Sequence, residues 1–233
     1  MRKKSKFIPI AITLLLSGCT IRLQHLRTVE TGLTFPKDEF SGSSNLSKIA
    51  ITKLKDLRME KEAVSIFEPS VGFFLMQVKH KFIYSLSSDE DICELFSMQI
   101  SKEISKLGYD TEYSASGQGD NVSELKGIIK RTGSDALIGG ELKMFYGSWG
   151  EVSQFLAKFQ SIVTSCQLNI FLLSGTGEKF YEDTVDITST YEKRIWLTGI
   201  SKKEAGVAVR ESIENAVTKL MHDPEFKKAL KRL

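Results

Sequence analysis

The sequence predicts an α+β fold in which helices pack on a mixed β-sheet. Two segments carry apolar residues at helical spacing, residues 89–107 and 202–222. Two others, residues 160–173 and 179–191, have the apolar alternation and the length of strands. Further strand-like runs stand before and between the helices, and this mixed order is typical of a sheet with helices on one or both faces.

The first eighteen residues have the pattern of a bacterial secretion signal. Bases within the first six residues precede an apolar run at 7–16, which is too short to cross about 30 Å of hydrocarbon. The run ends in Leu16-Ser17-Gly18-Cys19, which resembles the lipobox of bacterial lipoproteins. The resemblance implies that the chain is cut before Cys19 and that Cys19 is acylated. The alternative is an ordinary signal in which this cysteine is incidental.

An acylated Cys19 would be a lasting membrane anchor. Each buried CH₂ contributes ~0.8 kcal/mol, and one acyl chain binds only marginally, whereas two or three chains hold a protein in place. In lipoproteins of enteric bacteria an Asp after the cysteine favours the inner membrane. Thr20 therefore indicates the outer membrane, with the protein on its periplasmic face.

The charge of the mature chain excludes one class of partner. The whole sequence has 32 Lys+Arg against 29 Asp+Glu. Residues 1–18 hold four bases and no acid, so 32 − 4 leaves 28 bases against 29 acids, a net charge of −1. A near-neutral chain without a long basic run gives no reason to expect nucleic acid as a partner.

Residues 19–47 are expected to form a lipidated tether. The segment ends in Ser41-Gly42-Ser43-Ser44-Asn45, a composition typical of flexible linkers. A short edge strand through Ile21, Leu23 and Leu26 is the alternative for its first part. No break in composition divides residues 48–233, which are therefore expected to form a single domain.

The first elements of this domain are two strand regions and a helix. Residues 48–54 alternate as a strand, and residues 71–86 are predicted to form a hairpin that turns at Lys79-His80-Lys81. The helix at 89–107 follows Ser88 and several acids, and it stops at Gly108.

The remaining elements are bounded mainly by glycine or proline. The hairpin formed by residues 160–173 and 179–191 turns at Ser174-Gly175-Thr176-Gly177, and Pro224 opens a short basic helix after the helix at 202–222. Between the two long helices the sequence also predicts a strand at 109–113, a helix at 122–131 closed by Gly133, and a strand at 135–145.

One stretch carries a resemblance to known lipoproteins. The segment "ELKGIIKRTGSDALIGGELKMF", residues 124–145, is similar to a helix-and-strand pattern in YajG-like lipoproteins, the amino-terminal domain of TolB and the curli-secretion lipoproteins. With the strand before Asp56-Leu57-Arg58 and the helix ending at Gly108, the resemblance covers about two thirds of the mature chain. It implies an anticodon-binding-like fold similar to the TolB amino-terminal domain.

The sequence predicts no catalytic, metal or cofactor site. Its three histidines, His25, His80 and His222, lie far apart, and no cysteine or carboxylate accompanies them at metal-ligand spacing. His80 is expected in a solvated turn. We therefore expect a protein that is not an enzyme and that needs no cofactor.

Two cysteines, Cys93 and Cys166, remain besides Cys19. Cys93 lies near the apolar face of its helix, and Cys166 belongs to the same alternating set as Leu168 and Ile170, so both are predicted to point into one core. Export to an oxidising compartment would permit a disulfide between them. Two separate buried thiols are the alternative.

Aromatic residues indicate where a partner would bind. Tyr146 and Trp149 are flanked by Gly147 and Gly150 just after a predicted strand, which suggests a loop, and large aromatics on loops commonly anchor partners. Phe73 and Phe74 are the next candidates, because adjacent residues of a strand face opposite sides of the sheet.

The leading functional hypothesis is a non-catalytic, lipid-anchored envelope protein that binds or helps assemble another envelope component. The anchor attaches it to the membrane, and an envelope protein is the expected partner. A transport-auxiliary lipoprotein that binds a lipid or small hydrophobe between sheet and helices is the alternative.

Overall fold

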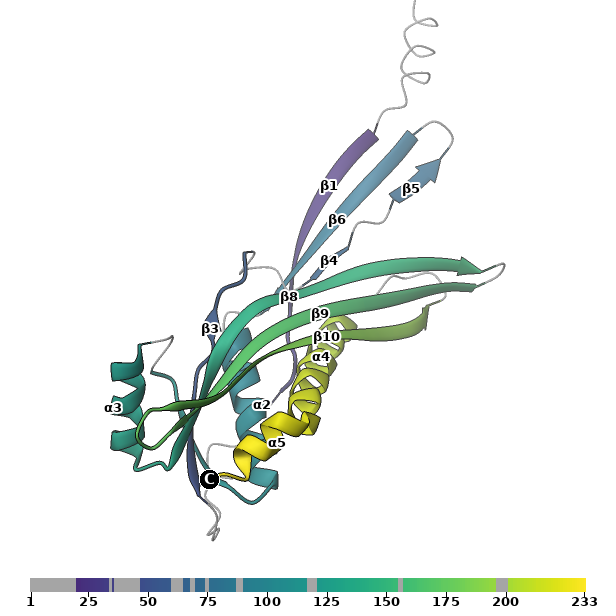
Figure 1. Ribbon diagram of the computed structural model, residues 1–233. Coiled ribbons are helices and arrows are strands. Elements are labelled where there is room, and N and C mark those ends of the chain that lie inside the picture. Colours follow the sequence, from purple (N-terminus) through teal and green to yellow (C-terminus); the bar gives the residue numbers. More distant parts are fainter. Residues whose placement is uncertain are drawn as a thin grey trace, which may run out of the picture.

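The computed structural model describes residues 20–33, 35, 47–59, 65–67, 70–73, 76–86, 90–116, 121–154, 157–195 and 201–233. Cys19 and the predicted signal lie outside these residues. In the described part of the chain, one mixed sheet of ten strands carries four helices (Figure 1). The sheet is open, and the predicted α+β class is confirmed.

Strand β8 (Ala136–Gln154) is shared by all parts of the sheet. Along one edge it pairs antiparallel with β9 (Ala157–Ser174), which in turn pairs with β10 (Lys179–Ile195). Along its other edge it pairs in parallel with three short strands, β2 (Lys48–Thr52), β3 (Lys55–Asp56) and β4 (Ser65–Phe67).

The short strands extend the sheet in two directions. At one end β2 pairs in parallel with β7 (Asp110–Ser114). At the other end β4 pairs antiparallel with β6 (Met76–Leu86), which also pairs with β5 (Ser70–Phe73) and, in parallel, with β1 (Thr20–Val29). Figure 1 shows β1, β5 and β6 as an arm that extends beyond the helices.

The predicted hairpin at 71–86 is present, but its predicted turn is wrong. Lys79-His80-Lys81 lies inside β6, and Phe73 pairs with Met76, so the chain reverses between these two residues. His80 is therefore a strand residue. Lys79 and Lys81 are two positions apart, so they belong to one alternating set of the strand and His80 belongs to the other.

The first part of the predicted tether is strand β1, the alternative that the apolar alternation of Ile21 and Leu23 suggested. It pairs with β6 over its whole length, from Thr20 beside Gln77 to Val29 beside Leu86. The linker-like stretch at 41–45 lies outside the described residues.

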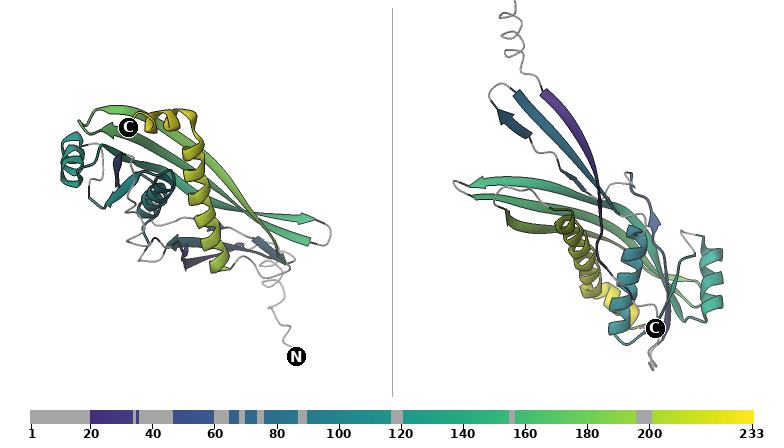
Figure 2. Two further views of the ribbon diagram at one scale, coloured as in Figure 1. Left: turned by 90° about the horizontal axis from the view of Figure 1, so that it is seen from below. Right: turned by 180° about the vertical axis from the view of Figure 1, so that it is seen from behind.

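Three helices pack on one face of the sheet, namely α2 (Ile92–Lys106), α4 (Lys202–His222) and α5 (Pro224–Leu230). Helix α3 (Val122–Thr132) packs on the other face, against alternate residues such as Leu137 and Phe171 (Figures 1 and 2). All four correspond to predicted helices. No helix among the described residues has both the length and the apolar character to span a membrane.

Local capping explains where these helices begin and end. Asp91, rather than Ser88, caps α2 by accepting from the backbone N–H groups of Cys93 and Glu94. Helix α4 begins with a capping box, in which Ser201 and Glu204 each bond the other's backbone N–H. Gly133 ends α3 with a φ of 63°, a value that glycine adopts at little cost.

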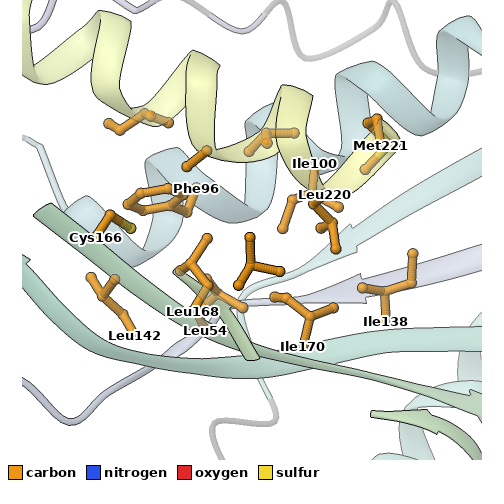
Figure 3. Packing of buried hydrophobic residues seen from close by; sticks show 14 of the residues in the cluster. Leu54, Phe96, Ile100, Ile138, Leu142, Cys166, Leu168, Ile170, Leu220 and Met221 are labelled. Atoms are coloured by element: carbon orange, nitrogen blue, oxygen red, sulfur yellow. The ribbon is translucent and has the colours of Figure 1, made fainter. Parts of the chain in front are cut away.

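Phe96 of α2 lies at the centre of the larger core. Its side chain, labelled in Figure 3, has no exposed area. Its ring forms a T-shaped pair with the ring of Phe145 from β8, with the centroids 5.9 Å apart. Such a T-shaped pair is favourable beyond the burial of its area. The contact joins α2 directly to the strand shared by both halves of the sheet.

Replacing Phe96 with alanine is expected to lower the free energy of unfolding by about 3–5 kcal/mol, because the change leaves a cavity in a fully packed core. Lys102→Ala, on the half-exposed side of the same helix, should change it by less than about 0.5 kcal/mol. Urea unfolding followed by circular dichroism measures both. Equal, small effects would contradict the packing of α2.

The segment that follows β1 is fixed against two helices. The backbone N–H and hydroxyl of Thr31 both donate to the Glu90 carboxylate, just before α2. In α4, a Cβ added at Gly206 would collide with the backbone carbonyl oxygen of Glu30. Only a residue without a side chain lets the two backbones approach this closely.

Two glycine-to-alanine substitutions in helices are expected to have opposite effects. Gly206→Ala should destabilise the protein, because the new methyl group meets the backbone of Glu30. Gly127→Ala in α3 should stabilise it by about 1 kcal/mol, since nothing lies within 4 Å of the added Cβ and alanine favours a helix. Thermal unfolding measures both, and stabilisation by both substitutions would show that α4 does not hold residue 30.

Candidate functional site

A β-bulge in β8 decides which residues reach the surface of the sheet. The register with β9 shifts between Leu142 and Met144, so Lys143 is an extra residue. Leu142, before the bulge, and Phe145, after it, are both buried under the helices. Met144 and Tyr146 are turned outward instead, with exposures of 43% and 38%.

Met144 and Tyr146 lie on a face that crosses three strands. Met144 pairs with Gln167 of β9, and Tyr146 pairs with Ser165. These two β9 residues are paired in turn with residues of β10: Gln167 with Asp186, and Ser165 with Thr188. We call these six residues the Tyr146 face: Met144, Tyr146, Ser165, Gln167, Asp186 and Thr188.

The Tyr146 face combines large apolar side chains with small polar ones. Asp186 and Thr188 are exposed, Ser165 and Gln167 are partly buried, and the Gln167 amide donates to the Asp186 carboxylate at 2.8 Å. Tyrosine and methionine are enriched in protein interfaces, where they bury much area while nearby polar groups keep the free surface soluble. This composition suits the reversible binding of a protein.

An ionised carboxylate lies on the same strands toward α3. The pKa of Glu182 is lowered mainly because the Lys179 ammonium donates to it at 3.0 Å, and secondly because the Asn169 amide donates at 3.2 Å. Lys179 also lies 5.0 Å from the centre of the Phe171 ring. The Lys179–Glu182 ion pair therefore adds no net charge beside Asp186.

The two leading predicted contact residues are not brought together. The loop predicted at residues 146–150 is wrong, because this segment continues β8 and pairs with β9 without interruption. Trp149 pairs with Ile162, which is buried against α4 together with Ala208. Because paired residues share a face, Trp149 occupies the alternating set opposite to that of Tyr146.

The other predicted contact residues belong elsewhere. Phe73 ends β5 at the tip of the β5–β6 hairpin, and β4 lies between β6 and β8 in the sheet. Phe74 lies outside the described residues, as does Cys19. The Tyr146 face therefore contains one of the four predicted contact residues and adds five, which the sequence missed because the bulge has no local signature.

Cys93 and Cys166 are both buried in the larger core, as their positions predict, and the structure has them as free thiols. Burial, followed by the charges of Asp56 and Asp91, raises the pKa of Cys93 to about 12. Burial likewise raises the pKa of Cys166, and Cys93 contributes to that shift. A disulfide between them remains a prediction.

A pocket of about 320 Å³ lies where β10 passes the end of α4. Its ionisable side chains already serve the fold. Asp223 caps α5, Lys219 donates to the backbone carbonyl of Asp186, and Nδ1 of His222 bonds the carbonyl of Thr218 at 2.8 Å. In the described ranges, no three His, Cys, Asp or Glu side chains are placed to hold a metal ion.

A buried ion pair follows β3, at the Asp56-Leu57-Arg58 step. Arg58 is 6% exposed, and its guanidinium donates to both Asp56 carboxylate oxygens, at 3.0 and 2.8 Å. This ion pair was not predicted from the sequence. The only sequence signal for this ion pair was an acid and a base two positions apart after an apolar strand.

Comparison with known proteins leaves the family open. No family model matches the chain, and no curated protein matches it. Among solved structures, a neuraminyllactose-binding hemagglutinin homolog from Helicobacter pylori is 12% identical, with a TM-score of 0.40, covering 88% of this chain and 97% of that one. Lipoprotein GNA1162 from Neisseria meningitidis is 10% identical, with a TM-score of 0.34 and coverages of 76% and 99%.

The similar structures also include the LpoB C-terminal domain from Salmonella enterica, at 13% identity and a TM-score of 0.21, covering 63% of this chain and 86% of that one. Bacterial lipoproteins are thus among the structures to which this chain is similar, but the expected YajG-like membership is not confirmed. Because all these TM-scores are below 0.5, no functional argument rests on them.

The buried thiols are expected to resist alkylation. At pH 8 iodoacetamide should modify Cys93 and Cys166 far more slowly in the folded protein than in urea, because burial suppresses the reactive thiolate. Mass spectrometry of the two peptides measures the rates. Rapid labelling of the native protein would contradict their burial, and failure to label in urea until a reductant is added would reveal the predicted disulfide.

Proposed function

We propose that this protein is a non-catalytic, lipid-anchored component of the bacterial cell envelope that binds or helps assemble another envelope protein. The proposed location is the periplasmic face of the outer membrane. The basic start, the short apolar run and the order Leu16-Ser17-Gly18-Cys19 support the anchor. Thr20 supports the outer membrane.

The exposed apolar residues of the Tyr146 face are the main support for a binding function. The solvent-facing side of a sheet usually carries polar residues. Met144 and Tyr146 are nevertheless exposed there, and the residues paired with them across β9 and β10 are polar. Exposed large apolar residues with a polar surround are typical of protein contact sites. The exposed Asp186 favours a partner that offers a basic residue or a hydrogen-bond donor at that position.

The carrier function receives no comparable support. Figure 3 shows the space between sheet and helices filled by side chains such as Phe96, Leu168 and Ile170, each with no exposed area. A lipid or small hydrophobe would need an apolar cavity there. Within the described residues, the pocket beside β10 lies at the surface and not between sheet and helices, and it is lined by Val185 and Pro224 together with charged residues such as Asp183 and Lys219.

A photo-crosslinking amino acid at position 146 is expected to capture one envelope protein in intact cells, because Tyr146 would lie in the interface. The same residue at Lys228, exposed on α5, is the matched control and should not capture that protein. Tyr146→Ser should weaken co-purification of the captured protein without changing the melting temperature. Equal capture from positions 146 and 228 would contradict the assignment of the Tyr146 face.

The anchor has a separate readout in the same cells. The intact mass of the purified protein should correspond to a chain that begins at Cys19 and carries acyl chains. A protein cut elsewhere, with an unmodified Cys19, would refute the anchor while leaving the Tyr146 result interpretable.

A further inference from the structure

Strand β10 is an edge of the sheet. In the part of the chain that the structure describes it pairs with β9 alone, and Figure 1 shows it as the outermost of the three long strands. Its register with β9 runs without a shift from Tyr181 to Ile195. The outer side of an edge strand carries backbone N–H and C=O groups that can pair with another chain.

Two contacts identify the residues whose backbone faces this edge. The Lys219 ammonium donates to the backbone carbonyl of Asp186, and the backbone N–H of Thr184 donates to the carboxylate of the residue before it at 2.7 Å. The backbone groups of Thr184 and Asp186 therefore point away from β9. Because backbone direction alternates along a strand, Thr188 and Thr190 also turn their N–H and C=O groups toward the edge.

The edge is closed at residues 184–186 and open beyond them. Sheet edges are commonly protected by charged residues or proline, and the run Thr188-Ser189-Thr190 contains neither. Thr188 and Thr190 are both exposed. A strand added here would pair with these residues and leave the edge at Asp186, whose carbonyl is already bonded.

The pocket beside β10 lies at the closed end of this edge. Its volume is about 320 Å³, and its lining residues include Asp183, Asp186 and Asp223 against Lys219 and His222. The acidic residues outnumber the basic ones even when His222 is protonated, so the pocket favours a cationic group. Asp183 and Asp223 accept backbone N–H groups through Oδ1, and each carboxylate has a second oxygen that can accept from a ligand.

The buried hydroxyl of Tyr181 is a further acceptor near this pocket. Tyr181 is 9% exposed, and its hydroxyl has no hydrogen-bond partner among the described residues. Burial raises the pKa of Tyr181, and the charges of Asp223 and Asp183 raise it further, so the hydroxyl lies near both carboxylates. A lysine or arginine side chain would supply the donors that these oxygens accept.

We infer that the β10 edge binds an extended segment of the partner protein, which adds a strand beside Thr188 and Thr190 and places a lysine or arginine side chain in the pocket. Main-chain hydrogen bonds give strand addition its affinity, and side-chain pockets give it specificity. The inference rests on the proposed binding function. Asp186 and Thr188 belong both to this edge and to the Tyr146 face, so a protein bound to that face would reach the edge.

Photo-crosslinking from two positions tests the strand geometry. A photo-crosslinking amino acid is placed at Thr188 or Thr190 of the full chain in intact cells, with Lys228 on α5 as the exposed control. We expect positions 188 and 190, but not 228, to capture the protein that position 146 captures. Mass spectrometry should place the two adducts on one segment of that protein, about two residues apart, because paired strands advance in step.

Proline substitution separates the backbone from the side chains. Thr190→Pro removes an outward N–H and should lower the adduct yield from position 188 about tenfold, because a partner carbonyl loses its donor. Thr190→Val keeps the N–H and the side-chain shape and should leave the yield unchanged. Neither should lower the melting temperature, whereas Ser189→Pro should, because that N–H faces β9. Thr188→Pro, read from position 190, repeats the test if Thr190→Pro unfolds the protein.

The pocket has its own variants. Asp183→Asn combined with Asp223→Asn keeps the Oδ1 acceptors but removes two charges, and it should lower the adduct yield from position 188 several-fold. Glu178→Gln, at an exposed acid in the turn between β9 and β10, is the matched control and should leave the yield unchanged. An unchanged yield with both asparagines would overturn the assignment of the pocket.

The remaining outcomes separate the edge from the proposed binding function. Capture from position 146 but not from 190, or capture from the edge that Thr190→Pro leaves unchanged, would overturn strand addition and leave the binding function intact. Adducts that contain two copies of this chain would overturn the partner segment and assign the edge to self-association. No capture from positions 146, 188 and 190 would refute the binding function and this inference with it.

Discussion

The register shift at Lys143 is the constraint on which both the core and the proposed binding face depend. Side chains of a regular strand alternate between its two faces. Without the extra residue, Met144 and Tyr146 would therefore face the core together with Leu142, and Phe145 would face solvent. With it, Phe145 turns inward to meet Phe96 of α2. One bulge therefore completes the core and exposes Tyr146 at the same time.

Strand β8 also links the arm formed by β1, β5 and β6 to the helical body. One of its edges holds β2, which packs on α2, and further along the same edge it holds β4, which pairs with β6 and so leads to β1. After β1 the chain is fixed again by Glu90 and by the close approach to Gly206. Two routes thus connect the arm to the helices.

Local chemistry was sufficient to predict much of the fold. The capping box of Ser201 and Glu204, the stop at Gly133 and the turn with Gly177 at a φ of 80° each act within a few residues, so α4, α3 and the β9–β10 hairpin were predicted close to their observed bounds. The burial of Cys166 could also be predicted, because the alternation of a strand depends only on neighbouring residues. The candidate site was predicted only at Tyr146, and for a reason, a loop, that is wrong.

The sequence by itself determined the helices, the β9–β10 hairpin, the net charge and the anchor pattern at Cys19, because each follows from neighbouring residues. Only the tertiary structure decided the bulge, the true turn between Phe73 and Met76, and the parallel pairing of β1 with β6. These features depend on which distant strand supplies the partner hydrogen bonds. A short polar run such as Lys79-His80-Lys81 is compatible both with a turn and with a strand. Only the pairing of β6 with its neighbouring strands decides between the two.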